Sequence, residues 1–335
     1  MDLSVAFMGT GGSVPTARRS TACSIVLRGG DRLMFDCGEG SQRQMQRSLG
    51  LLQLDEIYLT HLHADHYLGL PGLLKTYDLQ DRELPLTIFG PAGTADLFAT
   101  LRRLMGRTRY EIEVVEVAAG EPLAHDGYEV RPFPVEHRTT AYGWTLVEEI
   151  RPGRFDAEAA ARLGVPEGPA WGALQQGESV EGSDGTVRPA DVLGEQRPSR
   201  SLVISGDTAP CVATAEAARG AQLLVHDGSF AEEEAQRAAE TAHSTAGQAA
   251  ALAREAGVAM LALVHISSRY NVNEVLDEAR REFEKTVAPR DFDLIEIPYP
   301  DRGEPELVPN GARERREAPE ADPAKAASLP PEPAA

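Results

Sequence analysis

The chain has 335 residues, of which 42% are hydrophobic and 25% are charged, enough to bury a large core in one or two domains. Its 52 acidic and 33 basic residues give a net charge of −19, which argues against a nucleic-acid enzyme without excluding one. No run approaches the roughly 18 apolar residues of a membrane span, and the N-terminus does not resemble a signal peptide. We therefore expect a cytoplasmic protein with no membrane partner.

Strand-like segments alternate with helical segments along the chain, which predicts an α/β protein. The first strand is predicted at 4–8, and a hairpin follows at 22–35 with its turn at Gly29-Gly30-Asp31. Further strands are predicted at 56–60, 86–89, 202–205, 223–226, 260–265 and 294–297. Helices are predicted at 41–50, 71–80, 92–105, 231–256 and 271–284.

A glycine-rich turn, Gly-Thr-Gly-Gly-Ser-Val, follows the first predicted strand at 9–14. It fails the dinucleotide-binding pattern, because Val14 stands where the third glycine should be and Pro15 disfavours the helix that would hold a pyrophosphate. We interpret it as a structural turn and expect no nucleotide cofactor. The three cysteines form no C-x-x-C pair, so we expect buried thiols.

Three histidines and an aspartate lie within six positions after the strand at 56–60, as His61, His63, Asp65 and His66. Imidazole and carboxylate ligands without thiolate suit zinc, with manganese or iron as alternatives. Because the ligands form two facing groups, two metals are expected, and a shared carboxylate would hold them roughly 3.5 Å apart. Single surface or core histidines are the alternative, and their clustering argues against it.

Three further residues of ligand type lie at or just after the ends of predicted strands: His137, Asp207 and His265. Taken singly, each could be a loop histidine, a helix cap or a buried core histidine. Together with the cluster, they complete two coordination spheres.

The chain contains an ordered series of motifs: Phe7-Met8-Gly9-Thr10-Gly11, Phe35-Asp36-Cys37-Gly38-Glu39-Gly40, the histidine cluster with Gly69-Leu70-Pro71-Gly72, Ser205-Gly206-Asp207-Thr208, His243-Ser244-Thr245 and His265-Ile266-Ser267-Ser268-Arg269-Tyr270. This series resembles that of the metallo-β-lactamase-fold hydrolases, and within them the tRNase Z family of tRNA 3′-processing endoribonucleases. The resemblance covers residues 1–300. It implies a four-layer αβ/βα sandwich with the metals at the ends of the sheets.

The resemblance also implies the role of each site residue. His61, His63, His137 and Asp207 would bind one zinc, and Asp65, His66, Asp207 and His265 the other, with Asp207 as the bridge. Asp65 would orient the attacking water or take its proton, and His243 would protonate the departing oxygen. Cleavage of precursor tRNA would leave a 3′-hydroxyl on the tRNA and a 5′-phosphate on the trailer. A homodimer is the family expectation.

Residues 151–198 form a Gly/Pro-rich insertion with few apolar anchors, and a loop of this length is usually functional or disordered. By resemblance it is the protruding arm that holds the tRNA elbow. Its eight acidic residues outnumber its five arginines, so binding must depend on shape, backbone amides or a few arginines. The expected substrate-binding residues are Arg151, Arg154, Arg162, Gly168 and Pro169.

The segment 301–335 holds seven prolines and eight alanines with almost no large apolar side chain, so we predict a disordered acidic tail after a catalytic domain at 1–300.

Two alternative functions remain. A small-molecule phosphodiesterase or lactonase would share the metal ligands, because fold does not fix substrate. A binding or scaffold protein with a lapsed site is the more distant alternative.

Overall fold

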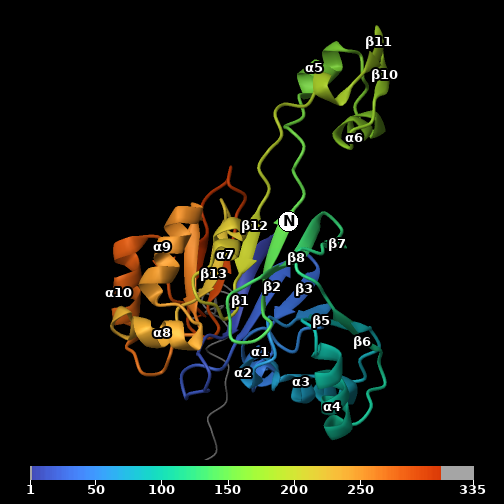
Figure 1. The fold of residues 1–335 in the computed structure, drawn as a ribbon. Coiled ribbons are helices and arrows are strands. Elements are labelled where there is room, and N and C mark those ends of the chain that lie inside the picture. Colours follow the sequence, from blue (N-terminus) through green and yellow to red (C-terminus); the bar gives the residue numbers. More distant parts are fainter. Residues whose placement is uncertain (1, 311–335) are drawn as a thin grey trace, which may run out of the picture.

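The computed structural model describes residues 2–310, which form a body of two stacked sheets and a projecting arm (Figure 1). The first sheet has eight strands in the order β17-β16-β1-β2-β3-β4-β5-β6. Its strands are β1 Leu3–Gly9, β2 Cys23–Arg28, β3 Asp31–Phe35, β4 Glu56–Tyr58, β5 Leu86–Gly90, β6 Ile112–Glu116, β16 Leu294–Glu296 and β17 Glu306–Val308.

The second sheet has seven strands in the order β15-β14-β13-β12-β9-β8-β7. These strands are β7 Leu123–His125, β8 Tyr128–Pro134, β9 Tyr142–Glu148, β12 Ser201–Ile204, β13 Leu223–Asp227, β14 Met260–Val264 and β15 Thr286–Val287. Neighbouring strands are parallel from β12 through β13 and β14 to β15. The pairs β7–β8, β8–β9 and β9–β12 are antiparallel. Parallel strands need long crossovers, and helices provide them here.

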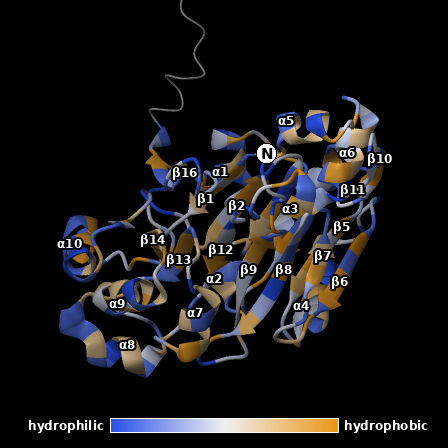
Figure 2. Cartoon of the chain, turned by 90° about the horizontal axis from the view of Figure 1, so that it is seen from above, coloured by the Kyte–Doolittle hydropathy of each residue, from blue (hydrophilic) through white to orange (hydrophobic). Residues whose placement is uncertain are grey.

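Helices cover the outer face of each sheet and complete four layers. The first sheet packs against α1 Ser41–Ser48, α3 Leu70–Leu79 and α4 Thr94–Met105 through one hydrophobic cluster. The second packs against α7 Val212–Ala217, α9 Ala246–Ala256 and α10 Val272–Glu282 through another. Hydrophobic residues follow the strands of both sheets (Figure 2). The expected αβ/βα sandwich is thus confirmed.

Strand β1 shows how the sequence creates these layers. Leu3, Val5 and Phe7 belong to the core between the two sheets, whereas Ala6 and Met8 belong to the core under the helices. Because side chains alternate across a strand, a buried central strand must be apolar on both faces. This is why the strand is predictable from its continuous apolar run.

One predicted helix is wrong. The segment 231–256 is not continuous but contains the 3₁₀ turn Glu232–Glu234, α8 Ala235–Thr241 and α9. Ala242 has a left-handed backbone (φ 55°) and ends α8. Thr245 then starts α9, since its hydroxyl accepts a hydrogen bond from Gln248 N while its own N–H donates to Gln248 Oε1. Alanine-rich periodicity cannot reveal such a break.

The predicted tail also begins too early. Residues 306–308 form β17, which pairs antiparallel with β16, and Val308 is buried in the core under the helices. The short apolar pair Leu307-Val308 was enough to add an edge strand. The remainder of the predicted tail, 311–335, lies outside the described residues.

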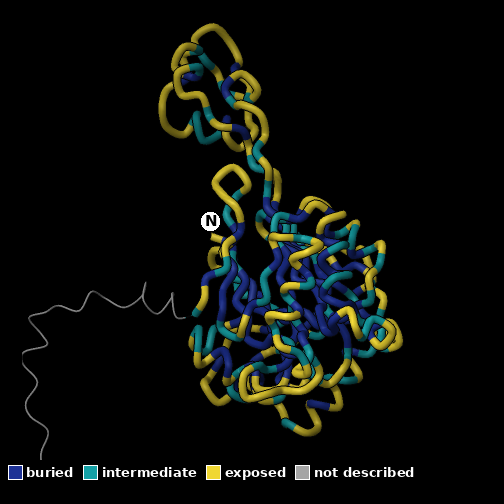
Figure 3. Tube along the Cα trace, turned by 90° about the vertical axis from the view of Figure 1, so that its left-hand side faces the viewer, coloured by how far each residue is buried: buried dark blue, intermediate teal, exposed yellow. Residues whose placement is uncertain are grey.

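The arm, defined as residues 151–198, extends away from the body on two chain segments (Figure 1) and is largely exposed (Figure 3). It contains α5 Ala157–Arg162, α6 Pro169–Gln175 and the hairpin of β10 Val180–Gly182 with β11 Gly185–Val187. A small core of its own holds these elements together, with Phe155 and Trp171 packed against Ala160, Val165, Leu174, Val187 and Val192. Its apolar anchors therefore make it a folded unit rather than a long loop.

No helix within residues 2–310 is both long and apolar enough to cross a membrane.

A buried ionic cluster joins the two sheets at the end where the arm begins. Both oxygens of Glu148 accept hydrogen bonds, from Arg28 Nε at 2.9 Å and from Arg200 Nε and Nη2 at 2.7 and 2.8 Å. Burial alone would raise the pKa of Glu148, but the two guanidinium groups lower it below its ordinary value. A buried pair is costly to break, since the remaining charge is left uncompensated.

Glu148→Gln is expected to lower the free energy of unfolding at pH 7 by about 3 kcal/mol, because two buried arginines lose their counter-charge. The folded-state pKa is depressed, so the stabilisation exists above the unfolded pKa of roughly 4.3 and is lost as pH falls through the folded pKa. Urea unfolding at several pH values measures both effects. Glu129→Gln, at an exposed pair with Arg131, is the control and should change stability by less than about 1 kcal/mol. Equal losses for the two variants would contradict the account.

Candidate metal and active site

All seven predicted metal ligands meet at one end of the two sheets. His61 and His63 follow β4, and Asp65 and His66 lie in the short helix α2 Ala64–Tyr67. His137 follows β8, Asp207 follows β12 and His265 follows β14. Loops at strand ends are where rigid scaffolds position reactive groups, so the topology explains why ligands 200 positions apart converge.

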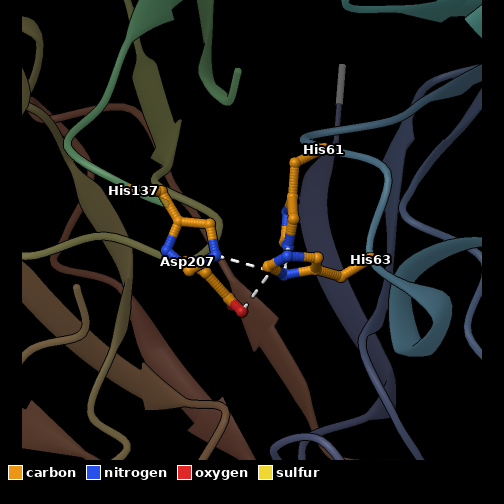
Figure 4. A group of neighbouring side chains, drawn as sticks. All are labelled: His61, His63, His137 and Asp207. Atoms are coloured by element: carbon orange, nitrogen blue, oxygen red, sulfur yellow. Dashed lines mark hydrogen bonds and ion pairs between the residues drawn. The ribbon is translucent and has the colours of Figure 1, made fainter. Parts of the chain in front are cut away.

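The first group contains His61, His63, His137 and Asp207, and their donor atoms point toward one another (Figure 4). His63 Nδ1 lies 2.9 Å from His61 Nε2 and 3.2 Å from His137 Nε2. His61 Nε2 is 3.7 Å from Asp207 Oδ2. Tetrahedral zinc, with Zn–N bonds of about 2.0–2.1 Å, requires ligand atoms separated by roughly these distances.

The second group contains Asp65, His66, Asp207 and His265. Asp207 Oδ2 lies 3.3 Å from His66 Nε2 and 3.4 Å from His265 Nε2, and Asp65 Oδ2 lies 3.2 Å from His265 Nε2. Asp207 thus borders both groups, which is the position of a bridging carboxylate. It is buried, so solvent cannot compensate its charge.

Hydrogen bonding shows that these atoms fit a metal. His66 Nε2 is buried and has no hydrogen-bond partner of adequate geometry among residues 2–310, although carboxylate oxygens lie 3.3 and 3.6 Å away. His137 Nδ1 donates to Ala242 O at 2.9 Å, so Nε2, which lies 3.2 Å from His63 Nδ1, keeps its lone pair toward the cluster. Buried polar atoms are rarely left unpaired, so a cation accounts for His66 Nε2.

The pKa shifts of the histidines in the two groups also indicate a site for a cation. Burial alone would lower the pKa of His66, but the carboxylates of Asp207 and Asp36 raise it well above its ordinary value. For His61, burial dominates and lowers the pKa well below the ordinary value, leaving a neutral ligand. The buried carboxylates therefore require positive charge, which protons or a divalent ion can supply in competition.

A second layer of residues orients the ligands. Asp36 accepts hydrogen bonds from Thr60 N at 2.8 Å and from His66 Nδ1 at 2.7 Å, so it fixes the His66 ring. Asp36 itself has a left-handed backbone (φ 57°), an unfavourable conformation of the kind that concentrates at functional sites. Its place in a sequence motif was evident, but this role was not predicted.

His243 lies at the rim of the site, in the break between α8 and α9. Its Nδ1 donates to Asp227 Oδ2 at 2.7 Å, and Asp227 also accepts from the Ser229 hydroxyl at 2.6 Å. Burial would lower the pKa of His243, but the Asp227 carboxylate outweighs burial and raises it to about 9. Asp227 was not among the predicted site residues; the only signal was an acid at the end of the apolar strand β13.

The glycine-rich turn at 9–14 contacts residues of the second ligand group. Ser13 N donates to Asp65 Oδ2 at 3.0 Å, so it helps to fix the position of this carboxylate in the second ligand group. A Cβ on Gly12 would lie 2.4 Å from the backbone oxygen of His265, so only glycine permits this approach. The turn is structural, as predicted, and it supports His265 and Asp65.

The predicted substrate-binding residues lie in the arm, which projects from the body that contains the ligand groups (Figure 1). The side chains of Arg154 and Arg162 are exposed, and so are Gly168 and Pro169 at the start of α6. Arg151 differs from these residues. Its side chain is only 13% exposed and pairs with Asp301.

Known proteins match this chain over most of its length. The family model of the metallo-beta-lactamase superfamily matches residues 16–235. The ribonuclease Z of Methanosarcina acetivorans is 47% identical over 302 residues, covering 89% of this chain and 99% of the relative. The chain belongs to the ribonuclease Z family. A second member, from Myxococcus xanthus, is 45% identical over 305 residues, covering 89% and 99% of the two chains.

Solved structures agree with this family membership. The short form of human tRNase Z is 25% identical with a TM-score of 0.64, covering 88% of this chain and 99% of that one. A metallo-β-lactamase-fold protein of Bacillus subtilis has a TM-score of 0.66 at 17% identity, and this likeness concerns the fold. The predicted family and hydrolase class are confirmed, and superfamily and ligand groups together indicate a divalent-metal site.

Proposed function

We propose that this chain is an endoribonuclease that removes the 3′ trailer from precursor tRNA in the cytoplasm. The observation that supports this most directly is the combination of two converging ligand groups with the His243–Asp227 pair at their rim. Near full-length identity of 44–48% to proteins named ribonuclease Z supports the substrate.

We propose zinc as the metal and two ions per chain. The donor set contains five histidines and two aspartates without thiolate, which suits zinc, while manganese remains an alternative. When bound, such ions lower the pKa of coordinated water and withdraw electrons from the phosphate.

The residues of the chain would divide the remaining chemistry. Asp65, held by Ser13 N, would orient the attacking water or accept its proton. Breaking the bond between phosphorus and the 3′-oxygen leaves the phosphate on the trailer, so the tRNA oxygen needs a proton. His243 would donate this proton from Nε2, because Nδ1 is fixed on Asp227.

A basic pocket beside the site supports RNA as the substrate despite the acidic composition. A cavity of about 1200 Å³ lies between the glycine-rich turn and the start of α10. Its only carboxylate among the described residues is Asp291, which accepts hydrogen bonds from Thr10, Ser20 and Gln44. The arginines that line it are Arg18, Arg19, Arg43, Arg47 and Arg290. These five arginines could contact the phosphates of an RNA bound beside the site.

We also propose a homodimer. The N–H of Tyr142, at the start of β9, donates to Thr60 O beside the ligands, and β9 ends at Glu148 where the arm begins. At about 3.4 Å per residue, the arm leaves the body roughly 20 Å from the site. This separation would let the arm of one subunit serve the site of another.

His243→Ala is expected to slow precursor tRNA cleavage by about a hundredfold or more while reducing hydrolysis of bis(p-nitrophenyl) phosphate by less than about tenfold. A ribose alkoxide needs a proton to depart, whereas nitrophenolate does not. Steady-state kinetics on both substrates test the proposed function and the role together. Asp227→Asn should show the same selectivity in weaker form. Equal losses on both substrates would remove His243 from this role, and no cleavage of precursor by the parent protein would overturn the function.

A further inference from the structure

The two segments that connect the arm to the body are fastened to each other. Arg151 in the first segment donates from Nε and Nη2 to Pro198 O in the second, at 3.1 and 2.8 Å. Arg197 N donates to Arg151 O at 3.0 Å. The segments therefore move as one unit, and the direction of the arm depends on what holds this unit at its base.

The C-terminal segment 297–302 supplies that hold. The guanidinium carbon of Arg151 lies 3.7 Å from the centre of the Tyr299 ring, and its Nη2 donates to Asp301 Oδ1 at 2.5 Å. Arg200 lies 3.9 Å from the centre of the same ring and donates to Ile297 O at 2.9 Å. Arg200 is in turn bound to the buried Glu148, so the contacts continue into the core.

We infer that Arg151 is a positioning residue that, through Tyr299 and Asp301, fixes the direction in which the arm leaves the body and thereby sets the affinity for precursor tRNA. The arm contains its own hydrophobic core, so its folding does not depend on the contacts of Arg151. These contacts determine how the arm is oriented relative to the body. A small rotation at the base displaces the tip of a long projection by much more. The effect on precursor binding rests on the function proposed above, whereas the effect on arm orientation does not.

Arg151→Ala, Tyr299→Leu and Asp301→Asn are each expected to raise the KM for precursor tRNA by about tenfold, with kcat and bis(p-nitrophenyl) phosphate hydrolysis within about twofold of the parent. The double variant Arg151→Ala/Asp301→Asn should be no worse than Arg151→Ala alone, because that single variant has already lost the contact with Asp301. Arg254→Ala, which breaks an exposed pair with Glu282, is the control and should leave the KM unchanged.

Two variants separate positioning from a direct phosphate contact. Asp301→Asn removes a carboxylate and frees Arg151, so it would tighten RNA binding if Arg151 acted through its charge. Arg151→Lys keeps the charge but loses the planar fork and the stacking, so positioning predicts a raised KM. Tighter binding by Asp301→Asn, or a parent KM for Arg151→Lys, would overturn the inference.

A measurement without RNA tests the orientation itself. Spin labels at Ser179→Cys in the arm and Glu83→Cys in the body, both exposed positions, give a distance distribution by pulsed electron resonance. The distribution should broaden in Arg151→Ala and Asp301→Asn at unchanged metal content and Tm. An unchanged distribution overturns the positioning role. A broadened distribution with a parent KM overturns its importance for precursor binding.

Discussion

Replacing Asp207 by alanine is expected to abolish phosphodiester hydrolysis and to remove most of the bound metal. Its Oδ2 lies within 3.3–3.7 Å of the Nε2 atoms of His66, His265 and His61, so one side chain serves both ligand groups. Its loss leaves each group with three ligands and removes one of the two carboxylates among them. We expect metal content to fall from about two to below one per chain, with activity reduced by more than about a thousandfold.

Metal analysis by mass spectrometry and hydrolysis of bis(p-nitrophenyl) phosphate measure both effects. His125→Ala is the matched control, because His125 lies outside the ligand groups, 3.3 Å from the Tyr58 hydroxyl. It should retain metal and activity. Full metal content in Asp207→Ala would show that this carboxylate is not the bridge.

Deleting residues 155–193 is expected to raise the KM for precursor tRNA by about a hundredfold or more, while the metal content and small-substrate hydrolysis stay near the parent values. The deletion removes the whole arm core, which includes no residue of the body's clusters. The cut ends already lie together, since Gly194 N donates to Arg154 O at 3.0 Å. The contacts of Arg151 with Tyr299 and Asp301 remain.

Precursor cleavage kinetics on the deleted protein, with metal content and Tm measured beside them, test the proposed exosite. Arg154→Ala and Arg162→Ala in the intact arm show whether the exposed arginines contribute. A folded deletion variant that processes precursor at the parent KM would exclude the arm as an RNA exosite.

The residues of the two candidate ligand groups could be identified from the sequence, because their spacing along the chain is a local signal. Three histidines within six positions are typical of a metal site, and His137, Asp207 and His265 all follow strands whose carboxyl ends meet. The assignment of each ligand to one of two groups came only through the family resemblance. Spacing alone does not specify which atoms face each other across two sheets.

Other parts of the site depend on tertiary contacts and could not be predicted. Asp227 could not be linked to the site, because its 2.7 Å contact with His243 depends on the break between α8 and α9. The contact of Arg151 with Asp301 was not predicted, because the two residues lie 150 positions apart in the chain. Edge strand β17 was missed because two apolar residues carry too little periodic signal.

The order of the strands also has a consequence during protein synthesis. β1 lies between β2 and β16, and the glycine-rich turn is anchored where Thr10 N donates to Asp291 Oδ1 at 3.1 Å. A nascent chain gains these partners only when nearly all of it has been translated. The arm closes on itself within residues 151–198 and can fold well before that. A chain released early would therefore carry a finished arm beside an unfinished nuclease centre.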